Sequence, residues 1–419
     1  MIKKIKNIYK IFGPGILMAT AAIGGSHLVS STQAGALFGW SLAIFILLIN
    51  FFKYPFFLAN VQYTMATKKS LIEGYASLGN SWLWLFTILA VIAAVVNTAA
   101  VSMFAASLLG YFIPIKLTIN ILSFIIIFAC ILILIAGKYN LLNNVSKIIM
   151  ITLSIATVVA VVMAVTKDVN SALADDFISP SAWTIASLGF IVILTGWMPA
   201  PIEISSIGSI WLKNQIKQTN INAKNALIDF NVGFIVTAIL AIFFLALGAL
   251  VLHGSAYEFK DGIAFSHQLV TMYSTVIGDW SRLLIAFIAF ACMFGTSITV
   301  IDGYGRAVAE AFSLIRKNRS ASNRSVAVWT IFISIIGFLI IIYFASSMRT
   351  MLDFAMILSF TTTPIFAFLN YKLVRSTKLP KELQNGMFLN ILSICGLIFL
   401  FGFLILFIVY RWFPFLIGL

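Results

Sequence analysis

Eleven apolar stretches, most of them about twenty residues or longer, follow one another along this 419-residue chain. A helix that crosses the hydrocarbon core of a bilayer needs about 20 apolar residues. Because the chain is 61% hydrophobic and only 10% charged, these stretches predict an all-α integral membrane protein with about 11 transmembrane helices. They cover residues 11–38, 41–66, 81–113, 117–136, 145–166, 184–212, 226–252, 281–311, 326–346, 350–371 and 387–411.

The positive charges predict the orientation of these spans. Most of the 27 Lys and Arg residues fall in the loops on one side of the predicted membrane. Because such loops stay in the cytoplasm, we expect a cytoplasmic N-terminus and an external C-terminus in the cell membrane. The net charge of +14 then reflects topology, and nucleic acid is not an expected partner. Lys53 is an exception inside the second span, where it lines protein, snorkels or contacts the substrate.

Two spans carry residues that interrupt a helix near its middle. Backbone that leaves helical geometry inside lipid is tolerated where it lines a cavity or binds a ligand. One break in each half is typical of inverted repeats whose discontinuous helices meet at the bilayer midplane. We therefore expect one transporter domain over 1–419, with repeats at 11–166 and 184–371 and an extra helix at 387–411. The breaks are Gly24-Gly25-Ser26-His27 and Gly196-Trp197-Met198-Pro199-Ala200-Pro201.

Three motifs make the sequence similar to the NRAMP family of metal-ion transporters. The opening GPGILMATAAIGGSHLVSSTQAGALFGW resembles the family's first span, and Met198-Pro199 resembles the start of its MPHN motif. The segment from Tyr304 to Glu310 resembles the end of the family's GQSST…AGQ stretch. The resemblance implies a leucine-transporter-type fold with broken first and sixth helices. It also implies secondary active transport of a metal cation by alternating access, with symport of a coupling ion.

This chain departs from the family at its charged positions. The DPGN motif falls on Gly24, Gly25, Ser26 and His27, so the metal-binding carboxylate is missing. The two histidines of the family's sixth span fall on Ala200 and Ser205, and its acidic pair falls on Asn97 and Ala100. The metal-binding Met is kept as Met198, and Thr195 lies where the family supplies a backbone carbonyl. A metal would therefore meet the neutral set of His27, Met198 and Thr195, whereas hard divalent ions prefer anionic oxygen.

The candidate site combines both breaks with two acidic residues. Glu203 replaces the lost carboxylate and takes up a coupling proton, or else pairs with a buried cation. Asp302 joins a path for H⁺ or Na⁺, or else pairs with Arg306 one turn away. The predicted substrate-binding residues are Gly24, Gly25, Ser26, His27, Thr195, Gly196, Trp197 and Met198.

Two alternatives to metal transport stay open. Amides freed at Gly24 and Gly25 could receive a carboxylate, as in an H⁺- or Na⁺-coupled transporter of a small organic solute such as an amino acid. A membrane sensor that has lost transport is the other. A metal site predicts converging ligands, and an organic site predicts a larger cavity with aromatic walls. The sequence shows no catalytic Ser/His/Asp set and no phosphate-binding loop, so neither an enzyme nor a cofactor is expected.

Overall fold

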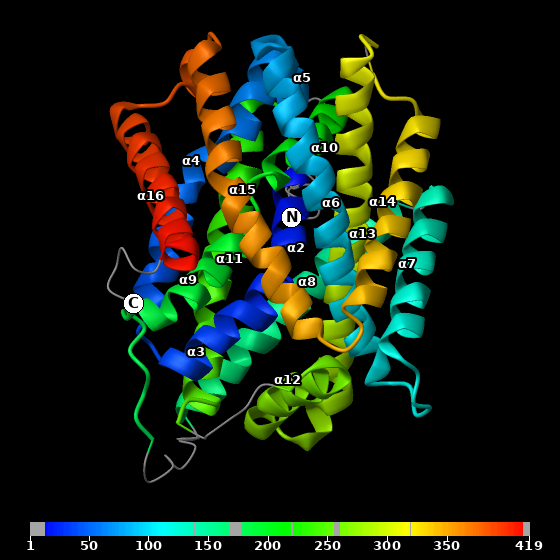
Figure 1. Ribbon diagram of the computed structural model, residues 1–419, viewed down its shortest axis with the longest axis vertical. Coiled ribbons are helices and arrows are strands. Elements are labelled where there is room, and N and C mark those ends of the chain that lie inside the picture. Colours follow the sequence, from blue (N-terminus) through cyan, green and yellow to red (C-terminus); the bar gives the residue numbers. More distant parts are fainter. Residues whose placement is uncertain are drawn as a thin grey trace, which may run out of the picture.

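The structure is a bundle of helices (Figure 1). This computed structural model describes residues 13–137, 139–166, 177–218, 221–254, 260–318 and 320–413, and every regular element within them is helical. The first five predicted spans correspond to α2 (Pro14–Ala22) with η1 (Ser26–Ser31) and α3 (Thr32–Phe38), α4 (Ala43–Thr67), α6 (Asn80–Gly110), α7 (Ile119–Ile135) and α8 (Tyr139–Thr166). The other six correspond to η2 (Ile185–Ser187) with α9 (Leu188–Trp197) and α10 (Ile204–Gln218), α11 (Ala223–Val251), α13 (Arg282–Ile315), α14 (Asn323–Tyr343), α15 (Met348–Ser376) and α16 (Met387–Trp412).

Within the described residues, seven helices are long and apolar enough to cross a membrane by themselves. They are α4, α6, α11, α13 with the preceding η3 (Asp279–Ser281), α14, α15 and α16. The remaining predicted spans are shorter apolar helices or the two broken ones. The prediction of eleven helical segments therefore holds, and the first and sixth are each divided into shorter helices.

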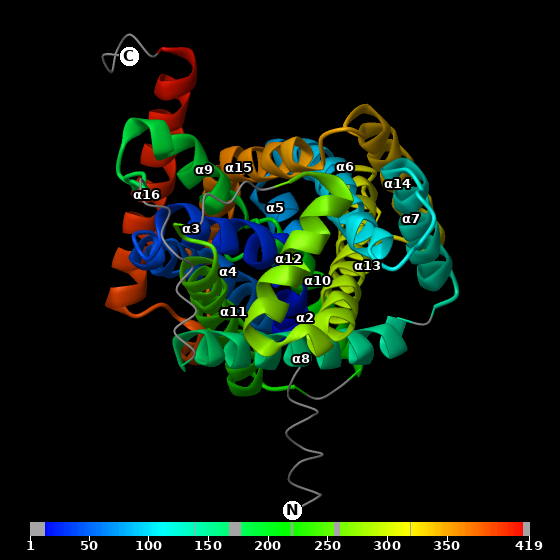
Figure 2. The same cartoon turned by 90° about the horizontal axis from the view of Figure 1, so that it is seen from below.

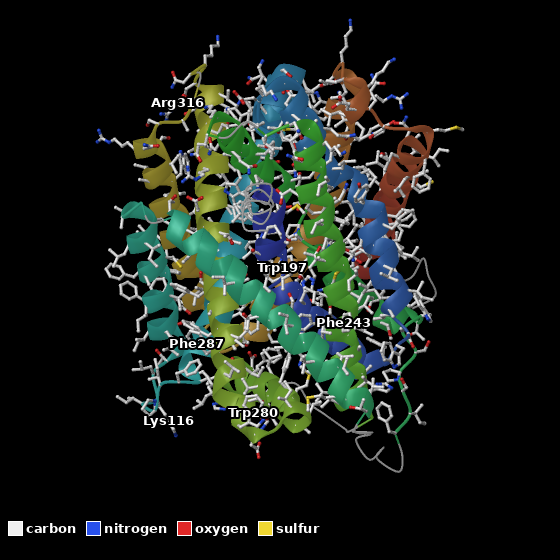
Figure 3. The ribbon with its side chains drawn as sticks, turned by 180° about the vertical axis from the view of Figure 1, so that it is seen from behind. Lys116, Trp197, Phe243, Trp280, Phe287 and Arg316 are labelled. Atoms are coloured by element: carbon white, nitrogen blue, oxygen red, sulfur yellow. The ribbon has the colours of Figure 1, made fainter. Side chains whose placement is uncertain are left out.

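Two helices were not predicted, because neither contains a long apolar run. The first is α5 (Leu71–Leu78), which starts with a capping box between Ser70 and Glu73. The second is α12 (Gly262–Ile277), which lies across one end of the bundle (Figure 1). Arg316 and Lys116, which the charge pattern assigns to opposite sides, lie at opposite ends (Figure 3). The predicted locations of the two termini concern residues 1–12 and 414–419, outside the described part.

The broken helices occupy the middle of the bundle. Viewed along the bundle, α2 and α10 lie inside a ring of longer helices (Figure 2). α2 packs against α11, α13 and α10, and α9 packs against α15. By contrast, α14 and α16 lie at the periphery with apolar side chains exposed, Ile398 by 68% and Leu339 by 55%. An apolar surface around an interior that contains polar groups is the arrangement that lipid requires.

Candidate functional site

The first break begins directly after α2. Ile23 leaves helical geometry, with φ −78° and ψ 84°. The chain then bends at Gly24, and Gly25 is already helical, with φ −55° and ψ −37°, before the π-helix η1. Short π-helical segments inside membrane-protein and enzyme helices often mark functional sites. The interruption therefore covers Ile23 and Gly24, so it starts one residue earlier than predicted and also ends earlier. Gly25 is helical, and Ser26 and His27 lie in the π-helix instead of in the unwound segment.

The second break separates α9 from α10. Met198 is extended, with φ −89° and ψ 120°, and helical structure resumes at Ile204. Both prolines of the motif lie in this irregular segment, as their missing N–H groups and fixed φ require. Just before the break, a Cβ atom at Gly196 would lie 1.9 Å from the carbonyl oxygen of Met356. Glycine is needed there because the backbones of α9 and α15 are in direct contact.

The two breaks face each other across a small cavity. The Ser26 Oγ atom lies 3.4 Å from the Pro199 carbonyl oxygen. Trp197 lies near the middle of the bundle (Figure 3), and its ring would be 2.5 Å from a Cβ atom at Gly25. The cavity between them has a volume of about 30 Å³. It is lined by Ala21, Ala22, Gly25, Ser26, Asn97, Val101, Trp197, Pro199, Ala200, Pro201, Ile204, Thr296, Val300 and Tyr304.

A hydrogen-bond network holds one wall of this cavity. The Trp197 indole N–H is shared between Asn97 Oδ1 and Ser359 Oγ, each 3.1 Å away. Asn97 Nδ2 donates to the Tyr304 hydroxyl over 2.9 Å, and that hydroxyl donates to Glu203 Oε1 over 3.1 Å. The other oxygen, Glu203 Oε2, is buried without a hydrogen-bond partner. The network joins α6, α9, α13, α15 and the second break.

The sequence identified only part of this network. Trp197 and Glu203 were predicted site residues, and Asn97 was noted because it falls at one of the family's acidic positions. Tyr304 was noted only as part of a motif, and Ser359 was missed. A polar residue in an apolar span was the one available signal for Ser359, and α15 carries several such residues.

His27 is fully buried, and both of its ring nitrogens have partners. Nε2 lies 2.9 Å from the Thr237 carbonyl oxygen, and Nδ1 lies 2.7 Å from Ser26 Oγ. A carbonyl only accepts, so Nε2 carries hydrogen, and in the neutral ring Nδ1 accepts from Ser26. The edge of the ring packs against Phe244, with centroids 5.8 Å apart. His27 therefore links the first break to α11.

The three predicted metal ligands point to different neighbours. Met198 is fully buried in an apolar cluster that also contains Leu194 and Ile49. The Thr195 hydroxyl donates to the Ile191 carbonyl over 2.7 Å, and its own carbonyl is held by a lysine. In the part of the chain that the structure describes, no three His, Cys, Asp or Glu side chains form a group able to hold a metal ion. His27, Met198 and Thr195 thus each contact a different set of neighbours.

The lysine that holds the Thr195 carbonyl is Lys53 of α4. Its Nζ atom lies 2.6 Å from the Thr195 oxygen and 3.4 Å from the Gly196 oxygen. Of the roles considered for Lys53 from the sequence, the structure shows that it lines protein, with a relative exposure of 0%.

Asp302 and the Gly24 amide also have partners within the protein. Both carboxylate oxygens of Asp302 accept from Arg306 Nε, at 2.8 and 2.9 Å, so the predicted pairing is present. The Gly24 amide donates to the Ala22 carbonyl over 3.0 Å. It is therefore not a free donor for a carboxylate.

Comparison with known proteins identifies the family. The sequence profile of the Nramp family, described as natural resistance-associated macrophage protein-like, matches residues 15–410. The chain belongs to the Nramp family. An uncharacterized protein of Pasteurella multocida is 48% identical over 402 residues, which are 96% of this chain and 92% of that relative. The resemblance seen in the sequence is confirmed, and this Nramp protein is an integral multi-pass membrane transporter and not an enzyme.

Solved structures share the fold of this Nramp protein. A manganese transporter of Eremococcus coleocola, in complex with an aromatic bis-isothiourea compound, matches with a TM-score of 0.69 and 13% identity over 96% of this chain and 86% of its own. MhsT in complex with L-phenylalanine matches with a TM-score of 0.64 and 13% identity over 93% and 98%. At such identities the likeness shows the fold alone, and that fold is the predicted leucine-transporter type.

Proposed function

We propose that this Nramp-family protein is a secondary active transporter that moves a metal cation by alternating access and holds it between the two breaks. The observation that carries this proposal is the small cavity of about 30 Å³ between the two breaks, which Ser26 and Pro199 help to line. Such a volume fits one or two water-sized groups or a small ion. Pockets for organic ligands are roughly ten to thirty times larger, at about 300–1,000 Å³. The cavity size therefore favours an ion as cargo.

The chemistry of the cavity wall is compatible with a hard cation. Ser26, Asn97 and Tyr304 supply hydroxyl and amide oxygens, which are ligands that hard cations accept. Glu203, which accepts a hydrogen bond from the Tyr304 hydroxyl, contributes negative charge near the cavity. Its Oε2 atom is the oxygen available for a coupling proton. We assign proton coupling to Glu203 and a structural ion pair to Asp302. The manganese transporter of E. coleocola, with the same fold, supports the choice of a metal cation.

The path of transport follows from the arrangement of the breaks. We propose that the five-span repeats at 11–166 and 184–371 move against each other, so that the cavity opens alternately to each side. The helix at 387–411 lies outside both repeats. The excess of Lys and Arg on one side supports a cytoplasmic N-terminus and an external C-terminus in the cell membrane.

A small organic solute is the second candidate cargo. The Trp197 ring forms an aromatic wall of the cavity, and Lys53 places a cation next to the second break. Both features suit an organic carboxylate better than a divalent metal. This candidate requires the cavity to widen considerably in an open conformation.

Uptake into proteoliposomes distinguishes these cargoes. Wild-type protein should take up at least one divalent metal from a panel that includes Mn²⁺, Fe²⁺ and Mg²⁺. Ser26→Ala removes a cavity hydroxyl and should reduce metal affinity by roughly tenfold, because one lost hydrogen bond or ligand costs about 1–1.5 kcal/mol. Met198→Leu is the matched control, because Met198 faces an apolar cluster and not the cavity lining.

The possible outcomes separate the hypotheses. Amino-acid uptake without metal uptake contradicts the proposal and supports the organic solute. Metal uptake that Met198→Leu impairs more than Ser26→Ala places the cargo away from the cavity. No uptake of either cargo class by folded protein favours a membrane sensor that no longer transports.

A further inference from the structure

Lys53 is a buried cation held by main-chain oxygens. It is the eleventh residue of the 25-residue helix α4, so it lies about 15 Å along a helix that is long enough to cross the bilayer. A charged side chain near the bilayer centre is costly unless protein groups replace its hydration. The carbonyl oxygens of Thr195 and Gly196, at 2.6 and 3.4 Å, provide that replacement.

These two carbonyls belong to the open end of a helix. The last four carbonyls of a helix have no intrahelical partner and carry partial negative charge. Because α9 stops at Trp197, Thr195 and Gly196 fall within that group. The helix end thus offers neutral oxygens and a dipole that attracts a cation, and the Lys53 ammonium occupies this position.

Lys53 is not one half of an ion pair. Among the described residues, no carboxylate oxygen lies within the 4.0 Å that defines the ion pairs of this structure. Glu203 acts on it electrostatically from the far end of the second break. The helices packed against α4 carry their charged residues toward the helix ends. These residues are Glu73 of α5, Lys213 and Lys217 of α10, Lys224 and Asp229 of α11, Arg349, Asp353, Lys372 and Arg375 of α15, and Arg411 of α16.

We propose that Lys53 fills a monovalent-cation site with its own ammonium group, formed by the carbonyl oxygens of Thr195 and Gly196 at the second break. The tethered ammonium stabilises the end of α9 as a bound alkali ion would. It cannot diffuse away, so the break keeps its structure without Na⁺ or K⁺ from solution. The inference goes beyond the proposed function, because it holds for any cargo.

Neutralising Lys53 tests the proposal. Lys53→Met keeps an unbranched apolar side chain but leaves the carbonyls without a cation, so a mobile cation should bind in its place. Thermal unfolding of the purified full-length protein is measured in choline, Na⁺, K⁺ and methylammonium chloride at equal ionic strength. Going from choline to about 100 mM of the best cation should raise the Tm of Lys53→Met by roughly 2–4 °C, in a saturable way. Wild type should shift by less than about 1 °C.

Two control variants separate the charge from the side chain. Lys53→Arg retains a cation and should show no added response to salt. Lys372→Met removes an ammonium that lies 3.9 Å from the centre of the Trp82 ring, away from the break, and should also show none.

Each of four results would overturn the proposal. The first is a folded Lys53→Met protein whose Tm does not change with the cation, and the second is a Tm change no larger than that of wild type or Lys372→Met. The third is a cation-dependent Tm change in Lys53→Arg. The fourth is a Lys53→Met protein that folds in none of the four salts. No cargo is needed for these measurements. A failure here is therefore distinguishable from a failure of the proposed metal transport, which only uptake can test.

Discussion

Replacing Tyr304 with phenylalanine removes the atom that connects Asn97 to Glu203. The lost hydroxyl accepts from Asn97 over 2.9 Å and donates to Glu203 over 3.1 Å. Because Glu203 Oε2 already lacks a partner, the change removes the hydrogen bond that Tyr304 donates to the other oxygen of a buried carboxyl. Hydrogen bonds within membrane proteins contribute about 0.6 kcal/mol on average and up to about 1.7. Two lost bonds therefore predict a fall of about 1–3 kcal/mol in the free energy of unfolding.

A double-mutant cycle isolates the bond between the hydroxyl and the carboxyl. Tyr304→Phe is combined with Glu203→Leu, and the free energies of unfolding are measured by denaturation in mixed micelles. If the bond exists, Tyr304→Phe should cost less once the carboxyl is gone. The coupling energy should be about 0.6–1.7 kcal/mol, a three- to eighteen-fold effect on the unfolding equilibrium.

Tyr273→Phe is the matched control for this cycle. Tyr273 is equally buried, and its hydroxyl lies 2.9 Å from Thr157 Oγ1, outside the network. Its combination with Glu203→Leu should be additive within about 0.3–0.5 kcal/mol. If the Tyr304 cycle is as additive as the Tyr273 cycle, the hydroxyl and the carboxyl do not interact, and the network described for this site is wrong.

Two further substitutions test the close contact between Gly25 and Trp197 and the ion pairs of Lys213. Gly25→Ala places a Cβ atom 2.5 Å from an indole carbon and should abolish uptake, whereas Gly189→Ala, with open space around its Cβ position, should leave the uptake rate unchanged. Lys213 bridges Glu73 at 2.6 Å and Glu310 at 3.2 Å, all with side-chain exposure between 10% and 17%. Lys213→Met should lose about 1 kcal/mol from these pairs and should raise about fivefold the population that is open at the end of the bundle where Lys213 lies. This population is measured by labelling a cysteine introduced into the cavity, in a variant without the three native cysteines. Unchanged labelling would show that these pairs do not hold the end closed.

The architecture could be predicted because its signals are local. A run of apolar residues fixes a span by its length alone, and Pro199 and Pro201 change the backbone at their own positions. The capping box of Ser70 and Glu73 was an equally local signal for α5, and reading it would have added that helix. For α12, the sequence contains no long apolar run, and the rule used for spans could not detect it.

The side-chain contacts around the two breaks could not be predicted from the sequence. Thr195 and Lys53 are 142 positions apart, and their contact depends on how α4 packs against α9. Met198 occupies a position where the family binds metal, yet its side chain points into an apolar cluster. Backbone irregularity follows from residue type, whereas the direction of a side chain follows from the packing of distant helices.

Lys53 and Glu203 hold the two ends of the second break. Lys53 binds the carbonyl oxygens just before the break, and Glu203, at its end, accepts from Tyr304. A movement that opens the break at either end takes a buried ionisable group away from its partners. Such groups are costly to leave unpaired in lipid, so each contact opposes opening and the two costs arise together. We expect for this reason that both contacts oppose opening of the second break, and that cargo opens it by replacing at least one of them.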